Sequence, residues 1–167
     1  MSSSRGQIFS PDLIIAVIVF IAGLSFFFTA SNSVFAQTDL LDERKNIDEV
    51  AHPLMASLVY LSGDPWNWEA LSQSDVNAFG LALEKNVLSA QKVSAFMGAL
   101  DSNYSLAKEK LGLGPYDFHV RLIDANGGVI ASAGGIASDA TSKLTYMRLA
   151  YYGGRQVTLV GVVSYAR

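Results

Sequence analysis

Residues 13–28 read LIIAVIVFIAGLSFFF, sixteen positions without a charged side chain, and no charge follows them until Asp39. If the helix continues over residues 13–36, it reaches about 36 Å at about 1.5 Å per residue, enough to cross a bilayer core of about 30 Å. Ser10 and Asp12 precede the stretch as a cap and as an acid that complements the positive end of the helix dipole. The stretch therefore predicts a membrane-spanning helix.

The composition of the whole chain narrows the class of protein. Of 167 residues, 50% are hydrophobic and 16% are charged, whereas ordinary soluble domains carry about 25% charged residues. Cysteine is absent from the sequence, which excludes disulfides, thiolate metal sites and cysteine nucleophiles. The formal net charge of −3 provides no electrostatic footprint for nucleic acid. The length suits one modest domain with an appendage.

Two other interpretations of the apolar stretch stay open. In a cleavable secretory signal, residues 13–28 would be the apolar region and cleavage would follow Ala36. Against this, the leader holds a single cation, Arg5, and the acid Asp12 lies directly before the apolar run. In a soluble protein the stretch would be a buried core helix, but it offers no polar side to face water.

The charges on the two sides of the stretch predict its orientation. Arg5 and the amino terminus precede it, whereas Asp39, Asp42 and Glu43 follow it. The positive-inside rule then places the short N-terminus in the cytoplasm and residues 37–167 outside the cell. We therefore expect a single-pass membrane protein with an extracellular C-terminal domain.

A second helical pattern follows the apolar stretch, over residues 37–61. Its apolar residues recur at steps of three and four, with charged residues on the other side, as in an amphipathic helix that faces a core. Because glycine and proline are absent between residues 28 and 52, we expect one rod over residues 11–61, with a kink at Pro53. The turn sequence at residues 62–65 predicts where the rod ends.

The remaining sequence divides into two regions with different predicted secondary structure. Residues 62–115 indicate loops and short helices, the helices at 90–100 and 103–111. In residues 116–167 apolar and polar residues alternate, which predicts strands at 116–124, 129–132, 144–152 and 155–165, the last two joined at Gly153-Gly154. The predicted fold class is α+β, with a three- or four-stranded antiparallel sheet packed on the amphipathic half of the long helix.

Residues that could carry chemistry are few. His52 and His119 lie far apart in the sequence, and no HExxH, GxSxG or DxDxDG motif is present, so we predict no catalytic, cofactor-binding or metal site. The protein is expected not to be an enzyme. Trp66 and Trp68 could stack on a sugar or a partner, although packing is the commoner use of such residues. Asn103 opens the only N-x-[ST] sequence and could carry a glycan outside the membrane.

The tyrosines of the C-terminal hairpin are a further candidate for binding. Tyr146, Tyr151, Tyr152 and Tyr165 could form an exposed adhesive stripe. Because successive side chains of a strand point to opposite faces, the sheet is expected to bury some of them and to leave about two available.

The leader and the apolar stretch together resemble the start of a type IV pilin. The residues that carry the likeness are Arg5-Gly6-Gln7 and the IFSPDLIIAVIVF that follows, which is most similar to archaeal pilin-like proteins with a class III signal peptide. Looser similarity to archaeal pilin-like ectodomains lies in LVYLSGDPWNWEAL, NVLSAQKV and RLAYYGG…VTLVGVV. The resemblance implies that a prepilin peptidase removes residues 1–7, or nearly so, and leaves residues 8–36 on the mature protein.

The site of that cleavage has two candidates. The family pattern has Gln at position +1, Ser at +3 and Glu at +5 of the mature chain. A cut between Gly6 and Gln7 puts Ser10 at +4 and Asp12 at +6, whereas a cut between Gln7 and Ile8 puts Asp12 at +5. Both bonds remain candidates for cleavage. Either cut leaves one acid directly before the apolar run.

Asp12 is the residue expected to matter for assembly. An apolar helix leaves a bilayer only if it buries its surface against copies of itself, and an unpaired carboxylate in that dry core is costly. The amine created by cleavage could offset Asp12 of a neighbouring subunit. The resemblance implies a structural subunit, major or minor, whose partners are the prepilin peptidase, the pilus assembly platform and other pilin subunits. The alternatives are a static surface protein whose ectodomain binds a ligand or partner, and a secreted domain that begins at Gln37.

Overall fold

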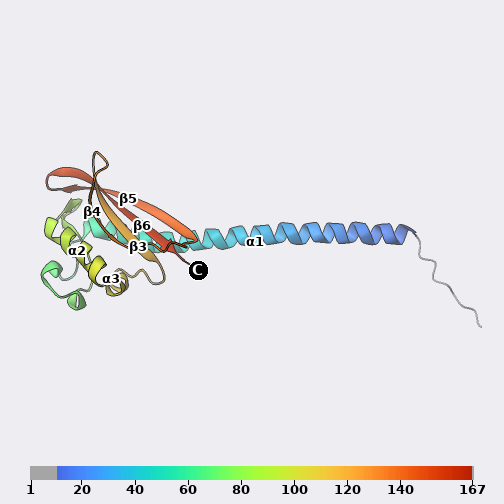
Figure 1. Cartoon of the computed structure of the whole chain (residues 1–167), viewed down its shortest axis with the longest axis horizontal. Coiled ribbons are helices and arrows are strands. Elements are labelled where there is room, and N and C mark those ends of the chain that lie inside the picture. The colour runs from blue at the N-terminus through green and yellow to red at the C-terminus, as the bar shows by residue number, and fades with distance from the viewer. Residues whose placement is uncertain (1–10, 167) are drawn as a thin grey trace, which may run out of the picture. The chain divides into compact units, whose positions relative to one another are not determined.

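The structure is a computed structural model that describes the backbone of residues 11–166 and the side chains of residues 11–31 and 42–166. It confirms the predicted α+β class (Figure 1). The chain divides into two compact units, one that ends at Asp42 and one that begins at Glu43. In chain order the elements are α1 (Pro11–Tyr60), η1 (Trp68–Ala70), η2 (Gln73–Asp75), β1 (Ala82–Glu84), β2 (Val87–Leu88), α2 (Ala90–Ser102), α3 (Tyr104–Lys110), β3 (Asp117–Asp124), β4 (Val129–Gly134), β5 (Ser142–Tyr152) and β6 (Arg155–Tyr165).

Helix α1 begins at Pro11, with Asp12 in its first turn, and has 50 residues. It continues through Pro53 and ends at Tyr60, just before a turn in which Gly63 has a φ of +91°. That backbone conformation favours glycine because a side chain would clash there. The helix therefore ends close to where the turn sequence predicts.

The sheet differs from the predicted one in size and in strand direction. It has six strands in the order β1-β2-β5-β6-β3-β4. The four C-terminal strands are antiparallel, and β5 and β6 form the hairpin expected at Gly153-Gly154. The short strands β1 and β2 extend the sheet beyond β5, and β2 pairs with β5 in parallel. The expectation of three or four purely antiparallel strands is therefore wrong, since the sheet is mixed.

One face of the sheet forms the core of the second unit. Along β3, the side chains of Phe118, Val120 and Leu122 alternate into this core. They pack with one side of α1, in which Ile47, Ala51, Leu54, Met55, Leu58 and Val59 are buried. The contact is close at Gly161 on β6, where a Cβ atom would collide with the sulfur of Met55. Helix α2 adds Val93, Phe96 and Leu100 to the same core.

Polar contacts also join the second unit's part of α1 to β5. The hydroxyl of Tyr146 donates to the carboxylate of Asp48 at 2.8 Å. Arg148 donates to the ring of His52 at 3.2 Å. Burial, and then the hydrogen bond and charge of Asp48, raise the pKa of Tyr146. These side chains point to the α1 side of the sheet, so the residues between them on β5 point away from it.

Candidate functional site

The first candidate site is the apolar segment of α1, Pro11–Ser31. Its 21 residues would extend about 32 Å as a helix, enough to cross a bilayer core of about 30 Å. The described parts of the chain bury none of its most apolar stretch. A segment of this length and composition could be a single membrane span or a signal sequence. Side chains exposed here include Ile15, Phe20 and Phe26.

Asp12 is the one charged residue of this apolar segment. It lies in the first turn of α1, where an acid stabilises the helix through its dipole. Among the side chains that the structure describes, none forms an ion pair with Asp12. The predicted processing residues Gly6, Gln7 and Ile8 lie outside the described residues.

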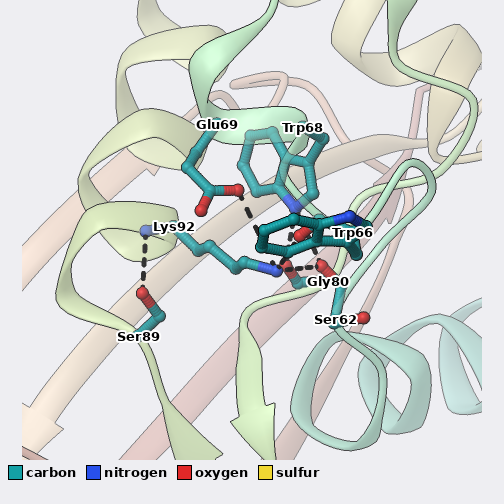
Figure 2. Close-up of polar contacts among 7 residues, drawn as sticks. All are labelled: Ser62, Trp66, Trp68, Glu69, Gly80, Ser89 and Lys92. Carbon is teal, nitrogen blue, oxygen red and sulfur yellow. Dashed lines mark hydrogen bonds and ion pairs between the residues drawn. The ribbon is translucent and has the colours of Figure 1, made fainter.

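A buried lysine organises the loop that follows α1 (Figure 2). The side chain of Lys92, on the first turn of α2, is almost fully buried. Its ammonium donates to the backbone carbonyls of Ser62 at 2.5 Å and Trp66 at 2.6 Å, and it lies 3.9 Å from a carboxylate oxygen of Glu69. That oxygen of Glu69 is buried and has no hydrogen-bond partner among the described residues, so the charge of Lys92 is what offsets it. One ammonium group thus fixes both ends of the five-residue loop 62–66.

Trp66, at the end of this loop, and Trp68, at the start of η1, have different environments. Trp68 is 2% exposed, and its indole N–H lies between the carbonyls of Gly80, at 2.9 Å, and Ser62, at 3.1 Å. Its ring contacts Phe79 edge to face at 5.0 Å. Trp66 is 75% exposed, although Lys92 holds its backbone. Trp68 is therefore a packing residue, and Trp66 alone is available to stack on a ligand or a partner.

The histidines do not form a common site. His52 contacts Arg148, whereas His119 on β3 lies 3.0 Å from the hydroxyl of Ser132 on β4. Burial, and then the nearby charge of Arg121, lower the pKa of His119, which favours its neutral form. Within the described residues, no three His, Asp or Glu side chains are grouped as a metal site would require.

Asn103 is exposed at the junction of α2 and α3. Its side-chain oxygen accepts a hydrogen bond from the backbone N–H of Leu106 at 3.3 Å and so caps α3. Its backbone carbonyl accepts from Gln73 at 3.3 Å. The placement leaves the predicted glycan acceptor at the surface, at the junction of the two helices.

The tyrosines predicted as an adhesive stripe are divided between the two faces of the sheet. Tyr146 bonds to Asp48 on the α1 side, and Tyr165 packs edge to face on Tyr116 at 5.8 Å. Tyr152 packs against the core, whereas Tyr151 is exposed on the opposite face. The hairpin therefore offers one exposed tyrosine where about two were expected.

Sequence reasoning missed Lys92 altogether. It lies three residues after Ser89, whose hydroxyl caps α2 by accepting from the Lys92 backbone N–H at 3.4 Å. Ser89 is visible in the sequence as a helix cap. No local pattern, however, indicates that the side chain of a lysine in the first turn of the helix will be buried under a distant loop.

Comparison with known proteins identifies no relative. No protein-family model matches the chain, and no curated protein or solved structure is significantly similar to it.

Proposed function

We propose that this protein is a membrane-anchored, pilin-like structural subunit of an archaeal cell-surface filament, major or minor, with no catalysis of its own. The proposal depends mainly on one observation, the uncovered apolar segment Pro11–Ser31 with its single charge at Asp12. An N-terminal prepilin leader, residues 1–7, would remain in the cytoplasm until it is cut after Gly6 or Gln7. Residues 37–167 would lie outside the cell.

The apolar surface of this segment restricts the environments in which the helix is stable, and this restriction is the reason for assembly. Each methylene removed from water contributes about 0.8 kcal/mol, so the segment is stable only in lipid or against other apolar helices. Within a bundle of such helices, the carboxylate of Asp12 would leave its aqueous environment at a cost of several kcal/mol unless a positive charge offsets it. The amine exposed by leader cleavage would supply that charge from a neighbouring subunit and would fix the axial register of the two chains.

The proposed partners follow from this scheme. The prepilin peptidase would act on the leader, the assembly platform would extract the helix from the membrane, and other pilin subunits would receive it. On the extracellular side, Asn103 is the residue that we propose for glycosylation, because it is exposed in an N-x-[ST] sequence. Mass spectrometry of the native protein would detect the added glycan on the peptide that contains Asn103, and a bare peptide would remove this part of the proposal.

The test of assembly is Asp12→Ala in the full chain, expressed in its native cells. Breaking a buried charge pair costs about 3–5 kcal/mol, which corresponds to a loss of filaments of 100-fold or more at equal membrane levels of protein. Asp42→Ala, an exposed acid further along α1, is the matched control and should assemble normally. Normal filaments from Asp12→Ala would refute the proposed role of this carboxylate.

A second function is favoured by the exposed Trp66. The backbone of this residue is fixed by Lys92, so a ligand would not have to order the loop before it binds. In this alternative the protein is a static single-pass surface protein whose ectodomain binds a ligand or partner. Its mature N-terminus would then be residue 1 or 2, whereas the filament proposal requires residue 7 or 8.

A further inference from the structure

An arginine without a counter-charge lies on the face of β3 that points away from the core. The apolar residues of β3 alternate into the core, so His119 and Arg121 point to the opposite face. Among the described residues, Arg121 forms no ion pair, and its Nε is buried without a hydrogen-bond partner. A buried donor that lacks a partner in the folded chain requires an explanation, and an ion bound to it is one.

Two hydrogen-bonding side chains lie beside Arg121 on this face. Ser132 of β4 pairs directly with Arg121, which sets their Cβ atoms about 4.5–5.5 Å apart. The hydroxyl of Ser132 lies 3.0 Å from Nε2 of His119. Burial, and then the charge of Arg121, lower the pKa of His119, so the guanidinium is close enough to act on the ring. Arg121, His119 and Ser132 are called the β3–β4 cluster here.

The strands around the β3–β4 cluster carry no acid that could neutralise Arg121. Asp117 is the one acid on the outward face of strands β3 to β6, and Lys108 of α3 already pairs with it at 3.1 Å. The β6 residues opposite the cluster are Val160 and Val162, which are 3% and 9% exposed. The only charged side chain that β5 adds to this face is the cation Lys143. The electrostatic potential at the cluster therefore favours an anion.

The donors of the β3–β4 cluster match the oxygens of a tetrahedral anion. A guanidinium presents two parallel N–H groups to two oxygens of one anion. When Nε2 of His119 carries a proton and donates to Ser132, the hydroxyl proton of Ser132 is free to bond to a third oxygen. A phosphate or sulfate group has that third oxygen, whereas a carboxylate has only two. Protonation of His119 at both nitrogens would add a second positive charge beside the anion.

We propose that Arg121, His119 and Ser132 form a binding site for a ligand that carries a phosphate or sulfate group. Arg121 supplies the charge and the paired N–H groups, Ser132 supplies a further hydrogen bond, and His119 orients the hydroxyl of Ser132. The site does not depend on the apolar segment of α1. It would give the protein a ligand-binding role in addition to the structural one.

A titration with inorganic sulfate, followed by NMR, tests this site in the full chain, purified in a non-ionic detergent at constant ionic strength. Sulfate is a dianion throughout the pH range in which histidine titrates, so any pH dependence reports on the protein. Sulfate should shift the ring signals of His119 saturably, with a dissociation constant in the millimolar range, and should raise the pKa of His119 because a nearby anion favours the protonated ring. By reciprocity, sulfate should bind about tenfold more tightly when His119 is protonated. His52 is the internal control: it also contacts an arginine, Arg148, but lies one turn from Asp48, and its signals should not move.

Substitutions separate the contributions of the cluster. Arg121→Gln should abolish the saturable shift of His119, and Ser132→Ala should weaken sulfate binding about threefold or more. Arg155→Gln removes an exposed arginine from the β5–β6 hairpin and should bind sulfate as the unmodified protein does. Because Ser132 is exposed, Ser132→Ala tests the site even if Arg121→Gln does not fold, and circular dichroism shows which variants are intact.

Several results would overturn the proposal. Equal shifts of His52 and His119, or no saturable shift of His119, would show that sulfate acts only by screening charges. An undiminished shift in Arg121→Gln would place the ion elsewhere. Tighter binding of acetate than of sulfate would assign the cluster to a carboxylate and not to a tetrahedral anion. None of these results bears on Asp12, so the proposed filament role would be unaffected.

Discussion

Replacing the buried Lys92 with Met should destabilise the second unit far more than the same change at the exposed Lys45. The change keeps an unbranched side chain but removes the ammonium that holds the carbonyls of Ser62 and Trp66. Hydrogen bonds from a charged group contribute about 1.5–3 kcal/mol each, and the change also leaves the nearby carboxylate oxygen of Glu69 without a counter-charge. Since some of these groups can reach water in the variant, we expect a loss of about 3 kcal/mol in the free energy of unfolding.

Urea unfolding followed by tryptophan fluorescence measures this loss. Trp66 and Trp68 are the only tryptophans and both lie beside the lysine, so the probe is local to the change. With a denaturant slope of about 2 kcal/mol per molar urea, the midpoint should fall by about 1.5 M. Lys45→Met is the matched control: Lys45 is exposed, and its ion pair with Glu49 at 3.9 Å is worth less than about 0.5 kcal/mol. A loss below about 1 kcal/mol for Lys92→Met would show that the loop does not depend on this ammonium.

Two further predictions concern the sheet. Gly161→Ala should lower the free energy of unfolding by about 1–3 kcal/mol in urea titrations, because the new methyl group meets the sulfur of Met55, whereas Gly98→Ala, in open space on α2, should leave stability equal or higher. Burial lowers the pKa of His119 below 6.5, so stability should fall as the pH drops through 6.5, where the unfolded chain takes up the proton first. In His119→Gln, the loss of unfolding free energy between pH 7 and pH 5 should be smaller than in the unmodified protein. An equal loss would contradict the lowered pKa of His119. An NMR titration that gives His119 a pKa of 6.5 or higher would contradict it as well.

The regular elements could be predicted because their apolar periodicity is strong. The helix expected at residues 90–100 is α2, two residues longer than predicted, and the strand expected at 116–124 is β3 within one residue. The hairpin at residues 144–165 was located by alternation and by Gly153-Gly154, and β5 begins two residues earlier than expected. In each case the local pattern and the packing favour the same structure.

Strands β1 and β2 could not be predicted, because long-range backbone bonds and not local pattern determine them. They have three and two residues, too few for alternation to be visible. Carbonyls at the end of α1 instead accept hydrogen bonds from this segment: Leu81 bonds to Leu58 at 2.9 Å, and Asn86 bonds to Val59 at 3.1 Å. A helix end whose carbonyls lack partners within the helix thus holds the short strands beside β5.

The candidate sites were predictable to different degrees. The apolar segment and Asp12 follow from composition, because a long uncharged run with one acid is visible in the sequence alone. The sequence could not tell the exposed Trp66 from the buried Trp68, since the two lie only two residues apart. What buries Trp68 is distant in the sequence: the ring of Phe79 and the carbonyl of Gly80. The exposed row of Met147, Leu149 and Tyr151 was missed for a related reason: β5 carries apolar residues on both faces, so alternation does not show which side meets water.

The central claim is that the apolar helix stays on the mature protein after a short leader is removed. N-terminal sequencing of the protein recovered from its native cells, supported by intact mass, tests this most directly. The account predicts a first residue of Gln7 or Ile8, and it predicts that Gly6→Val leaves the leader in place. A mature protein that begins at Gln37, or an unprocessed one that begins at residue 1 or 2, would contradict it.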